Sequence, residues 1–278
     1  MTEQRNEYLE MMEIFIRCGE ALRGKSISAE MSWQVYTEPI AMKLLFHLGS
    51  LHVLQKGTVL PAMAGVPIEY IDFPSIATLA RAAFETFLAF HFIFIDPPTN
   101  EQKRFRYDVW KLGGLKDRQR FFVTTQEGKD VLQKEKLSIE DLENAIKSNP
   151  LYLQLSEPRQ KEAMRGKWRF EKKWEDLAEL TGTHKGFFVS LYAYLSSFAH
   201  TGYLGILQLS QATEREIQQR LADIYTNIGL TIMSHFILAY CSLFQEAQNV
   251  LDQNDSYKKL VEVYFLKAED WERFIAKA

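Results

Sequence analysis

The sequence predicts an all-α protein, built as a multi-helix bundle with a charged helical and loop insertion in its middle. Three observations favour this fold class. Apolar residues recur at helical spacing through most of the 278 residues. Capping residues, prolines and glycines mark the ends of these segments. The sequence has no run of alternating β-branched residues of the kind that indicates a strand.

The composition is that of a globular protein. Hydrophobic residues make up 46% and charged residues 25% of the chain, so we expect a buried core and no overall disorder. The length favours a single domain over residues 1–278 with an insertion over residues 124–173. A net charge of −3 does not attract negatively charged nucleic acid to the protein as a whole, so an RNA contact would need a local basic patch.

Cysteine use and hydropathy predict a reduced, cytoplasmic protein. Cys18 and Cys241 lie far apart and form no CxxC or Cys/His metal pattern. Residues 1–13 are acidic and amphipathic, unlike a signal peptide. Residues 228–244 carry no charge and approach the length of a membrane span. Because the helical pattern continues past both ends into charged residues, we expect a buried core helix there and no membrane insertion.

Two helices are expected before residue 55. The first covers about residues 6–23 and closes at Gly24. Ser28 can cap a second helix, which runs towards Leu54. A proline inside a helix removes a hydrogen bond, so this helix should be interrupted or kinked near Pro39.

The third and fourth helices follow a loop rich in glycine and proline, residues 57–67. Residues 75–95 are apolar nearly all round, which predicts a central, buried helix that ends before Pro97. Thr99 or Asn100 can cap the next helix, which carries basic residues as far as Arg120.

The middle of the chain, residues 124–173, has a different character. It is charged and punctuated by proline, so we expect short helices and loops, one of them capped by Ser138. Helical patterns then resume over residues 174–180, 184–201 and 213–250, and two short helices finish the chain.

Arg81 and Glu85 are the first candidate functional residues. They stand four apart on the most apolar helix, so they share one face. A buried ion pair persists only when it is well partnered, because removing charges from water is costly. Two interpretations are open: a structural pair that bridges helices, and a pair that lines a polar cavity.

A second candidate group lies on the predicted helix over residues 184–201. Ser197 and His200 are three residues apart, and Tyr192 continues the same stripe. Histidine titrates near neutral pH and can act as a general acid or base. The alternative is a purely structural histidine, since no carboxylate lies within the same two turns to orient it.

Metal and nucleotide motifs are missing from the sequence. It has no HExxH, GxGxxG or Walker pattern, so we expect no metal and no cofactor. Two basic clusters, residues 103–120 and 159–173, can meet phosphates. The second is interleaved with Trp168 and Phe170, a pattern that suits stacking on single-stranded RNA. A solvated helical face is the alternative for both.

These segments together resemble a bacterial family of unknown function. The resemblance spans about residues 75–202 and consists of short motifs in a fixed order. They are Arg81, Glu85, Asp96-Pro97, Arg104 to Tyr107, Trp174, Gly182, Tyr192, Tyr194 and Ser197 to His200.

The helices and the late histidine are also similar in outline to the HEPN class (higher eukaryotes and prokaryotes nucleotide-binding). Many HEPN proteins are RNA-cleaving toxins or phage-defence proteins, and their site has an arginine about five residues before the histidine. Here Tyr194 and Leu195 stand at that place, so Arg81 or Arg104 would have to supply the charge. The resemblance implies His200, Arg81 and Glu85 as catalytic residues. It implies these as ligand-binding residues: Arg104, Tyr107, Tyr192 and Ser197.

Two functions from different classes follow. The first is a HEPN-like protein that acts on RNA or a nucleotide in a defence or toxin setting. The second is a non-catalytic helical module for binding or scaffolding. The sequence leaves open whether the chain is an enzyme and whether it forms a homodimer.

Overall fold

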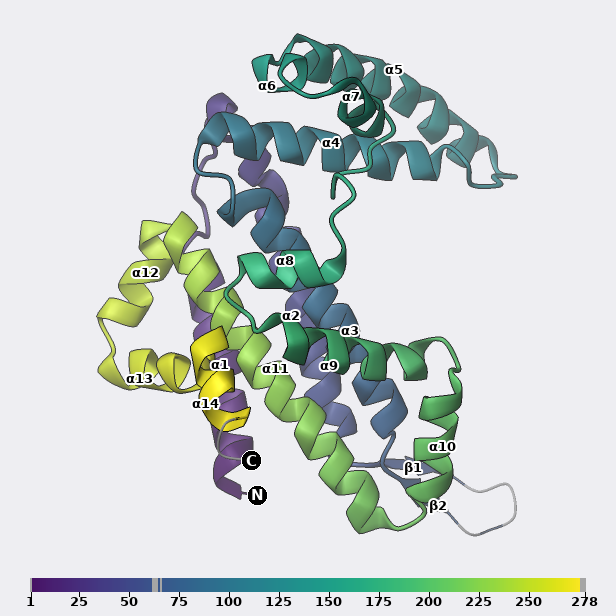
Figure 1. The fold of residues 1–278 in the computed structure, drawn as a ribbon, viewed down its shortest axis with the longest axis vertical. Helices are drawn as coiled ribbons and strands as arrows, with labels where there is room; N and C mark the ends of the chain where they lie inside the picture. Colours follow the sequence, from purple (N-terminus) through teal and green to yellow (C-terminus); the bar gives the residue numbers. More distant parts are fainter. Residues whose placement is uncertain (1, 62–64, 66, 276–278) are drawn as a thin grey trace. The chain divides into compact units, whose positions relative to one another are not determined.

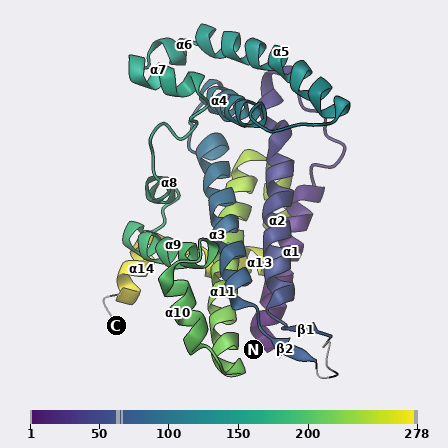
Figure 2. The ribbon, with the colours of Figure 1, turned by 90° about the vertical axis from the view of Figure 1, so that its right-hand side faces the viewer.

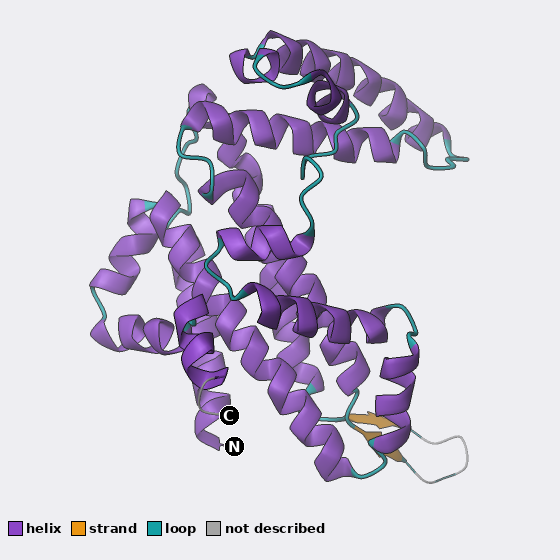
Figure 3. Ribbon diagram, in the orientation of Figure 1, coloured by secondary structure: helices purple, strands orange, loops and turns teal. Residues whose placement is uncertain are grey.

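The described residues fold mainly into helices, which confirms the predicted all-α class. The computed structural model describes residues 2–61, 65 and 67–275, drawn as a coloured ribbon in Figure 1. Figure 3 shows how little of the described chain is strand. One antiparallel sheet pairs β1 (Thr58–Leu60) with β2 (Ile68–Tyr70).

Two compact units divide the chain between them. Unit 1 comprises residues 1–25, 37–91 and 174–278, and unit 2 comprises residues 26–36 and 92–173. The helices described in unit 1 are α1 (Thr2–Glu20), α2 (Thr37–Leu54), α3 (Phe73–Phe90), α8 (Trp174–Leu180), α9 (Lys185–Ala199), α10 (Tyr203–Gln211), α11 (Arg215–Leu243), α12 (Gln245–Asp252), α13 (Asp255–Tyr264) and α14 (Ala268–Ile275). Those of unit 2 are η1 (Ala29–Tyr36), α4 (Asn100–Arg118), α5 (Gln126–Ser148), α6 (Pro150–Leu153) and α7 (Glu157–Met164). A π-helical turn, η2 (His91–Ile95), continues α3 along the chain. The insertion predicted over residues 124–173 lies within unit 2.

α3 lies at the centre of unit 1, as its apolar sequence predicts. It packs against α2, α9 and α11, and Figure 2 shows α2, α3 and α11 running alongside one another. Asp72 caps its first turn by accepting the backbone N–H of Ser75 at 3.1 Å. The side chains of Ala77 and Ala80 are fully buried, and their small size lets neighbouring helices approach closely.

α11 is the longest helix described and carries much of the core of unit 1. Ser234 is fully buried within it and donates to the carbonyl of Val261 at 2.6 Å. Among the described residues, Phe73–Ile95 and Arg215–Leu243 are long and apolar enough to cross a membrane, by length and composition alone. The protein itself buries 56% and 72% of their most apolar windows, which is also the pattern of core helices.

Unit 2 has a core of its own. Its buried apolar residues come from α4, α5 and α7: Phe105, Val109, Leu112, Leu142, Ile146 and Ala163. α4 begins with the predicted cap, in which Thr99 and Gln102 form a capping box. Gly113 lies within α4 and does not interrupt it. It provides room for the backbone of Gly166, because a Cβ at Gly113 would lie 2.4 Å from the Gly166 carbonyl oxygen.

The structure shows an interruption near Pro39 and corrects one predicted helix start. The helical segment after Ser28 is divided, because η1 ends at Tyr36 and a new helix begins at Thr37. Pro39 therefore lies in a first turn, where its missing N–H has no intrahelical partner to lose. Ser138 caps nothing, because it lies in the interior of α5. The serine followed by an acidic residue was therefore wrongly interpreted as a helix start, because the helix is continuous there.

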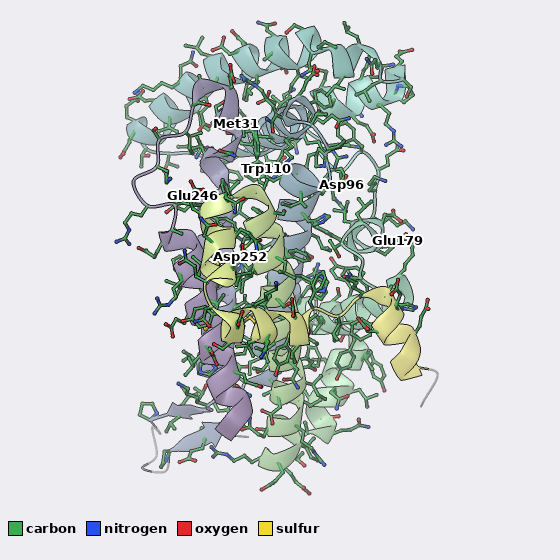
Figure 4. The ribbon with its side chains drawn as sticks, turned by 90° about the vertical axis from the view of Figure 1, so that its left-hand side faces the viewer. Met31, Asp96, Trp110, Glu179, Glu246 and Asp252 are labelled. Atoms are coloured by element: carbon green, nitrogen blue, oxygen red, sulfur yellow. The ribbon has the colours of Figure 1, made fainter. Side chains whose placement is uncertain are left out.

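The C-terminal half differs from expectation in its long helix. A single helix was expected over residues 213–250, whereas α11 begins after Glu214 and ends at Leu243. α12 then begins at once, with labelled Glu246 and Asp252 along it in Figure 4. Glu246 binds Lys25 at 2.8 Å, an ion pair that connects α12 to the segment that follows α1.

Candidate functional site

The site is built where α9 packs against α3 in unit 1. His184 starts α9, because its Nδ1 accepts the backbone N–H of Phe187 at 3.0 Å. Aromatic rings then join the two helices. Phe84 of α3 meets Phe188 edge to face at 5.2 Å, and Phe188 stacks on Tyr192 at 5.3 Å between centroids. This ring contact fixes the turn of α9 that carries the polar side chains.

Arg81 is the hub of the polar cluster. Its Nη2 lies 2.9 Å from Glu85 Oε1 and donates to the Tyr192 hydroxyl at 3.1 Å, and its Nη1 lies 3.2 Å from His200 Nε2. The four side chains, here called the Arg81 cluster, come from positions up to 119 residues apart in the sequence. The sequence predicted all four as site residues, and the fold brings them into contact.

Hydrogen bonds orient each member of the Arg81 cluster. The Tyr192 hydroxyl donates to Glu85 at 2.6 Å while it accepts from Arg81. Arginine carries only donors, so His200 Nε2 must be the acceptor of its contact, with the ring proton on Nδ1. The imidazole therefore holds a lone pair towards the guanidinium.

The electrostatics match these contacts. Burial disfavours the charge of Arg81, but its hydrogen bond to Tyr192 and the attraction of Glu85 outweigh that effect and raise its pKa. Burial, together with the hydrogen bond to Glu85, raises the pKa of Tyr192, so the phenol keeps its proton at neutral pH. The cluster is thus a charged pair held by a neutral phenol.

Access to the Arg81 cluster is on the His200 side. His200 is exposed, whereas the side chains of Arg81 and Glu85 are 18% and 29% exposed. α9 ends beside it because the N–H of Gly202 turns back to the Ser197 carbonyl at 2.7 Å. Thr201 between them has a φ of 54°, a strained value for a β-branched residue. The cluster is therefore a half-buried site that opens to water at one end.

The other predicted ligand-binding residues lie outside this network. The Ser197 hydroxyl donates to the Tyr194 carbonyl at 2.7 Å, a backbone bond inside its own helix. Arg104 and Tyr107 belong to unit 2. Arg104 is half exposed and lies 3.9 Å from Asp108, while Tyr107 is buried. Helical spacing placed Ser197 beside His200 but could not show where its hydroxyl points.

Many cations of the two predicted basic clusters are paired with carboxylates. Arg106 binds Asp96 at 2.6 Å, Lys116 binds Glu143 at 2.6 Å, and Arg118 binds Glu135. The interleaved aromatics are packed as well, since Trp168 and Phe170 lie against the core of unit 2. These pairs reduce the positive charge that unit 2 can offer to a phosphate backbone.

Sequence reasoning missed the ring pair that supports the site, Phe84 and Phe188. The available signal was spacing, because Phe188 precedes Tyr192 by one helical turn. Within the described part of the chain, no group of three or more His, Cys, Asp or Glu side chains is arranged to hold a metal ion.

Comparison with known proteins places the site inside a family match. The model of a family described as "Family of unknown function (DUF5677)" matches residues 68–217, more than half of the chain. The matched segment contains α3, α9 and all four members of the Arg81 cluster. The chain has no significant match among curated proteins or solved structures.

Proposed function

We propose that this chain, which belongs to the family of unknown function DUF5677, is a HEPN-like protein that cleaves RNA at the Arg81 cluster. The observation that carries the proposal is the 3.2 Å contact between Arg81 and His200. The HEPN resemblance calls for an arginine beside the histidine, and the local sequence lacks one. Here the guanidinium reaches the imidazole from α3.

The proposed chemistry uses the two ends of this contact. His200 Nε2 takes the proton of a ribose 2′-hydroxyl as the 2′ oxygen forms a bond to phosphorus. The bond from phosphorus to the 5′ oxygen breaks, and that oxygen takes a proton from water. The hydroxide left behind takes the proton held by His200, which restores the neutral imidazole. The products are a 2′,3′-cyclic phosphate and a 5′-hydroxyl. Arg81 donates to the non-bridging phosphate oxygens, whose charge grows in the transition state.

Glu85 and Tyr192 are positioning residues in this scheme. Both contact the Nη2 end of Arg81, which leaves the Nη1 end directed at His200. A phosphate would displace His200 as the acceptor at that end and free Nε2 for the 2′-hydroxyl. A bacterial defence or toxin role and a cytoplasmic location belong to the same proposal, through the HEPN resemblance.

A non-catalytic binding or scaffold module is the second candidate. The observation that favours it is the closed set of contacts among Arg81, Glu85 and Tyr192, which by itself ties α3 to α9. In that case the cluster stabilises the helical bundle, and His200 does not take part in catalysis.

An RNA cleavage assay separates the two candidates. Purified protein is incubated with end-labelled single-stranded RNA without added metal, beside His200→Ala, Arg81→Ala and the control His47→Ala. His47 lies on α2, outside the cluster. We expect His200→Ala and Arg81→Ala each to slow cleavage at least about 100-fold, with His47→Ala unchanged. Equal cleavage by wild type and His200→Ala, or none by the wild type, would rule out the proposal.

A further inference from the structure

Unit 1 contains a pocket of about 410 Å³ that the proposed RNA chemistry does not use. α3, α9, α11 and the segment after α13 form its walls. The rings of Phe84, Phe87 and Phe187 line it, together with aliphatic side chains that include Leu191 and Ile228. Its volume falls in the range of small-molecule sites, roughly 300–1,000 Å³.

We propose that this pocket binds an uncharged, largely apolar small molecule of about two fused rings that carries one hydroxyl or N–H donor. The lining residues that the structure describes include no lysine, arginine, aspartate or glutamate. A charged ligand would lose its hydration there without gaining a partner of opposite charge. An apolar ligand gains from burial against the phenylalanine rings.

His235 is a buried polar side chain in the lining of the pocket. It is 5% exposed, and its Nε2 lies 3.0 Å from the carbonyl oxygen of Leu266. A carbonyl only accepts, so Nε2 carries the proton and Nδ1 of the neutral ring is left as an acceptor. Burial lowers the pKa of His235 to about 4, which keeps the ring neutral. The acceptor calls for a donor on the ligand.

Other hydroxyls of the lining are already engaged. Tyr264 donates to Glu7 at 2.7 Å, and Thr231 donates to the carbonyl of Asn227 at 3.3 Å. These two hydroxyls give their protons to protein acceptors, so their oxygens can offer a ligand only a lone pair, which, like His235 Nδ1, favours a donor on the ligand.

One wall of the pocket is the segment from Tyr264 to Ala268, and three contacts fix it in place. The N–H of Ala268 donates to the Gly182 carbonyl at 2.8 Å, His235 holds the Leu266 carbonyl, and the rings of Phe265 and His235 lie 4.4 Å apart. Because this wall is already fixed, the pocket is preformed, and little conformational entropy is lost when a ligand binds.

Two matched probes test the ligand chemistry: 2-naphthol, which carries a hydroxyl donor, and 2-methoxynaphthalene, which does not. Binding to the full chain is measured by titration calorimetry and by thermal shift. We expect 2-naphthol to bind and raise the Tm, and 2-methoxynaphthalene to bind about tenfold more weakly, the value of one hydrogen bond. The anion 2-naphthalenesulfonate should not bind. Equal affinity for all three probes, or no binding of 2-naphthol, would overturn the proposal.

Two variants of α9 locate the probe. Leu191→Trp should fill the pocket and abolish 2-naphthol binding. Val189→Trp, on the same helix but 47% exposed and outside the lining, should bind it like the wild type. Ile228→Phe gives a second filled pocket, from α11, in case Leu191→Trp does not fold. Undiminished binding in a folded filled-pocket variant would contradict the assignment.

The outcome is independent of the proposed ribonuclease. His200→Ala should bind 2-naphthol as the wild type does, because His200 does not line the pocket. Loss of RNA cleavage with retained 2-naphthol binding is therefore the expected pattern for that variant. Loss of both would mean that the substitution damages unit 1 and that the pocket is not a separate site.

Discussion

Tyr192 shows how one side chain serves two neighbours at the residue scale. Its hydroxyl donates to Glu85 and accepts from Arg81, and its ring stacks on Phe188. Without the hydroxyl, a half-buried carboxylate and guanidinium would each lose a hydrogen-bond partner. Losing a hydrogen bond to a charged group is more costly than losing one between neutral groups.

Tyr192→Phe should therefore lower the free energy of unfolding by about 1–2 kcal/mol, because the ring stack remains and only the hydroxyl is lost. The measurement is urea unfolding followed by circular dichroism. Tyr203→Phe is the matched control, since Tyr203 is 80% exposed and should show no change. A Tyr192→Phe protein as stable as the control would mean that water replaces the hydroxyl at no cost.

His235 gives a pH dependence at the same scale. Its pKa of about 4 in the folded chain lies below the ordinary value of 6.5, so the unfolded chain binds more protons between these values. Stability from this residue is complete above pH 6.5 and falls as the pH drops towards 4, by about 3 kcal/mol in total.

His235→Gln isolates this effect, because glutamine can still donate to the Leu266 carbonyl but does not titrate in this range. Unfolding free energies at pH 7, 6, 5 and 4 should decline less steeply in the variant than in the wild type. Parallel curves for the two proteins would show that His235 is not held neutral.

Helix starts were predictable where a neighbouring side chain accepts a hydrogen bond from a backbone N–H of the first turn. Thr99 caps α4 through its side chain, and Asp72 caps α3 in the same way. Boundaries set by packing were not predictable. Ser138 has a capping pattern, but the buried side chains of Leu142 and Ile146 keep α5 continuous past it.

Gly113 and Gly114 give an element-scale test, because they are neighbours in α4 with opposite surroundings. A Cβ at Gly113 would collide with the backbone of Gly166, whereas a Cβ at Gly114 meets nothing within 4 Å. Gly113→Ala should destabilise unit 2 by about 1–3 kcal/mol through overpacking. Gly114→Ala should stabilise it by about 0.5–1 kcal/mol, because alanine is the better helix former.

The measurement for this pair is urea unfolding monitored by tryptophan fluorescence, with the wild type beside both variants. The sign of each change decides the test. Stabilisation by Gly113→Ala would mean that α4 and the segment around Gly166 do not approach each other as described.

Over the whole molecule, the candidate site depends on tertiary packing that no local pattern reveals. Sequence spacing identified Arg81 with Glu85 and Tyr192 with His200, each pair along its own helix. The contact between the pairs depends on how α3 and α9 pack, which is decided by rings such as Phe84 and Phe188. The pocket could not be predicted from the sequence either, because its lining comes from several elements far apart in the chain.

A double-mutant cycle on RNA cleavage tests the central claim, that Arg81 and His200 act as one site. Single-turnover rates are compared for the wild type, Arg81→Ala, His200→Ala and the double variant. The account predicts that the double variant is about as slow as the slower single variant, because residues that act together are not additive. Rate losses that simply multiply, or an Arg81→Ala protein that cleaves as fast as the wild type, would contradict it.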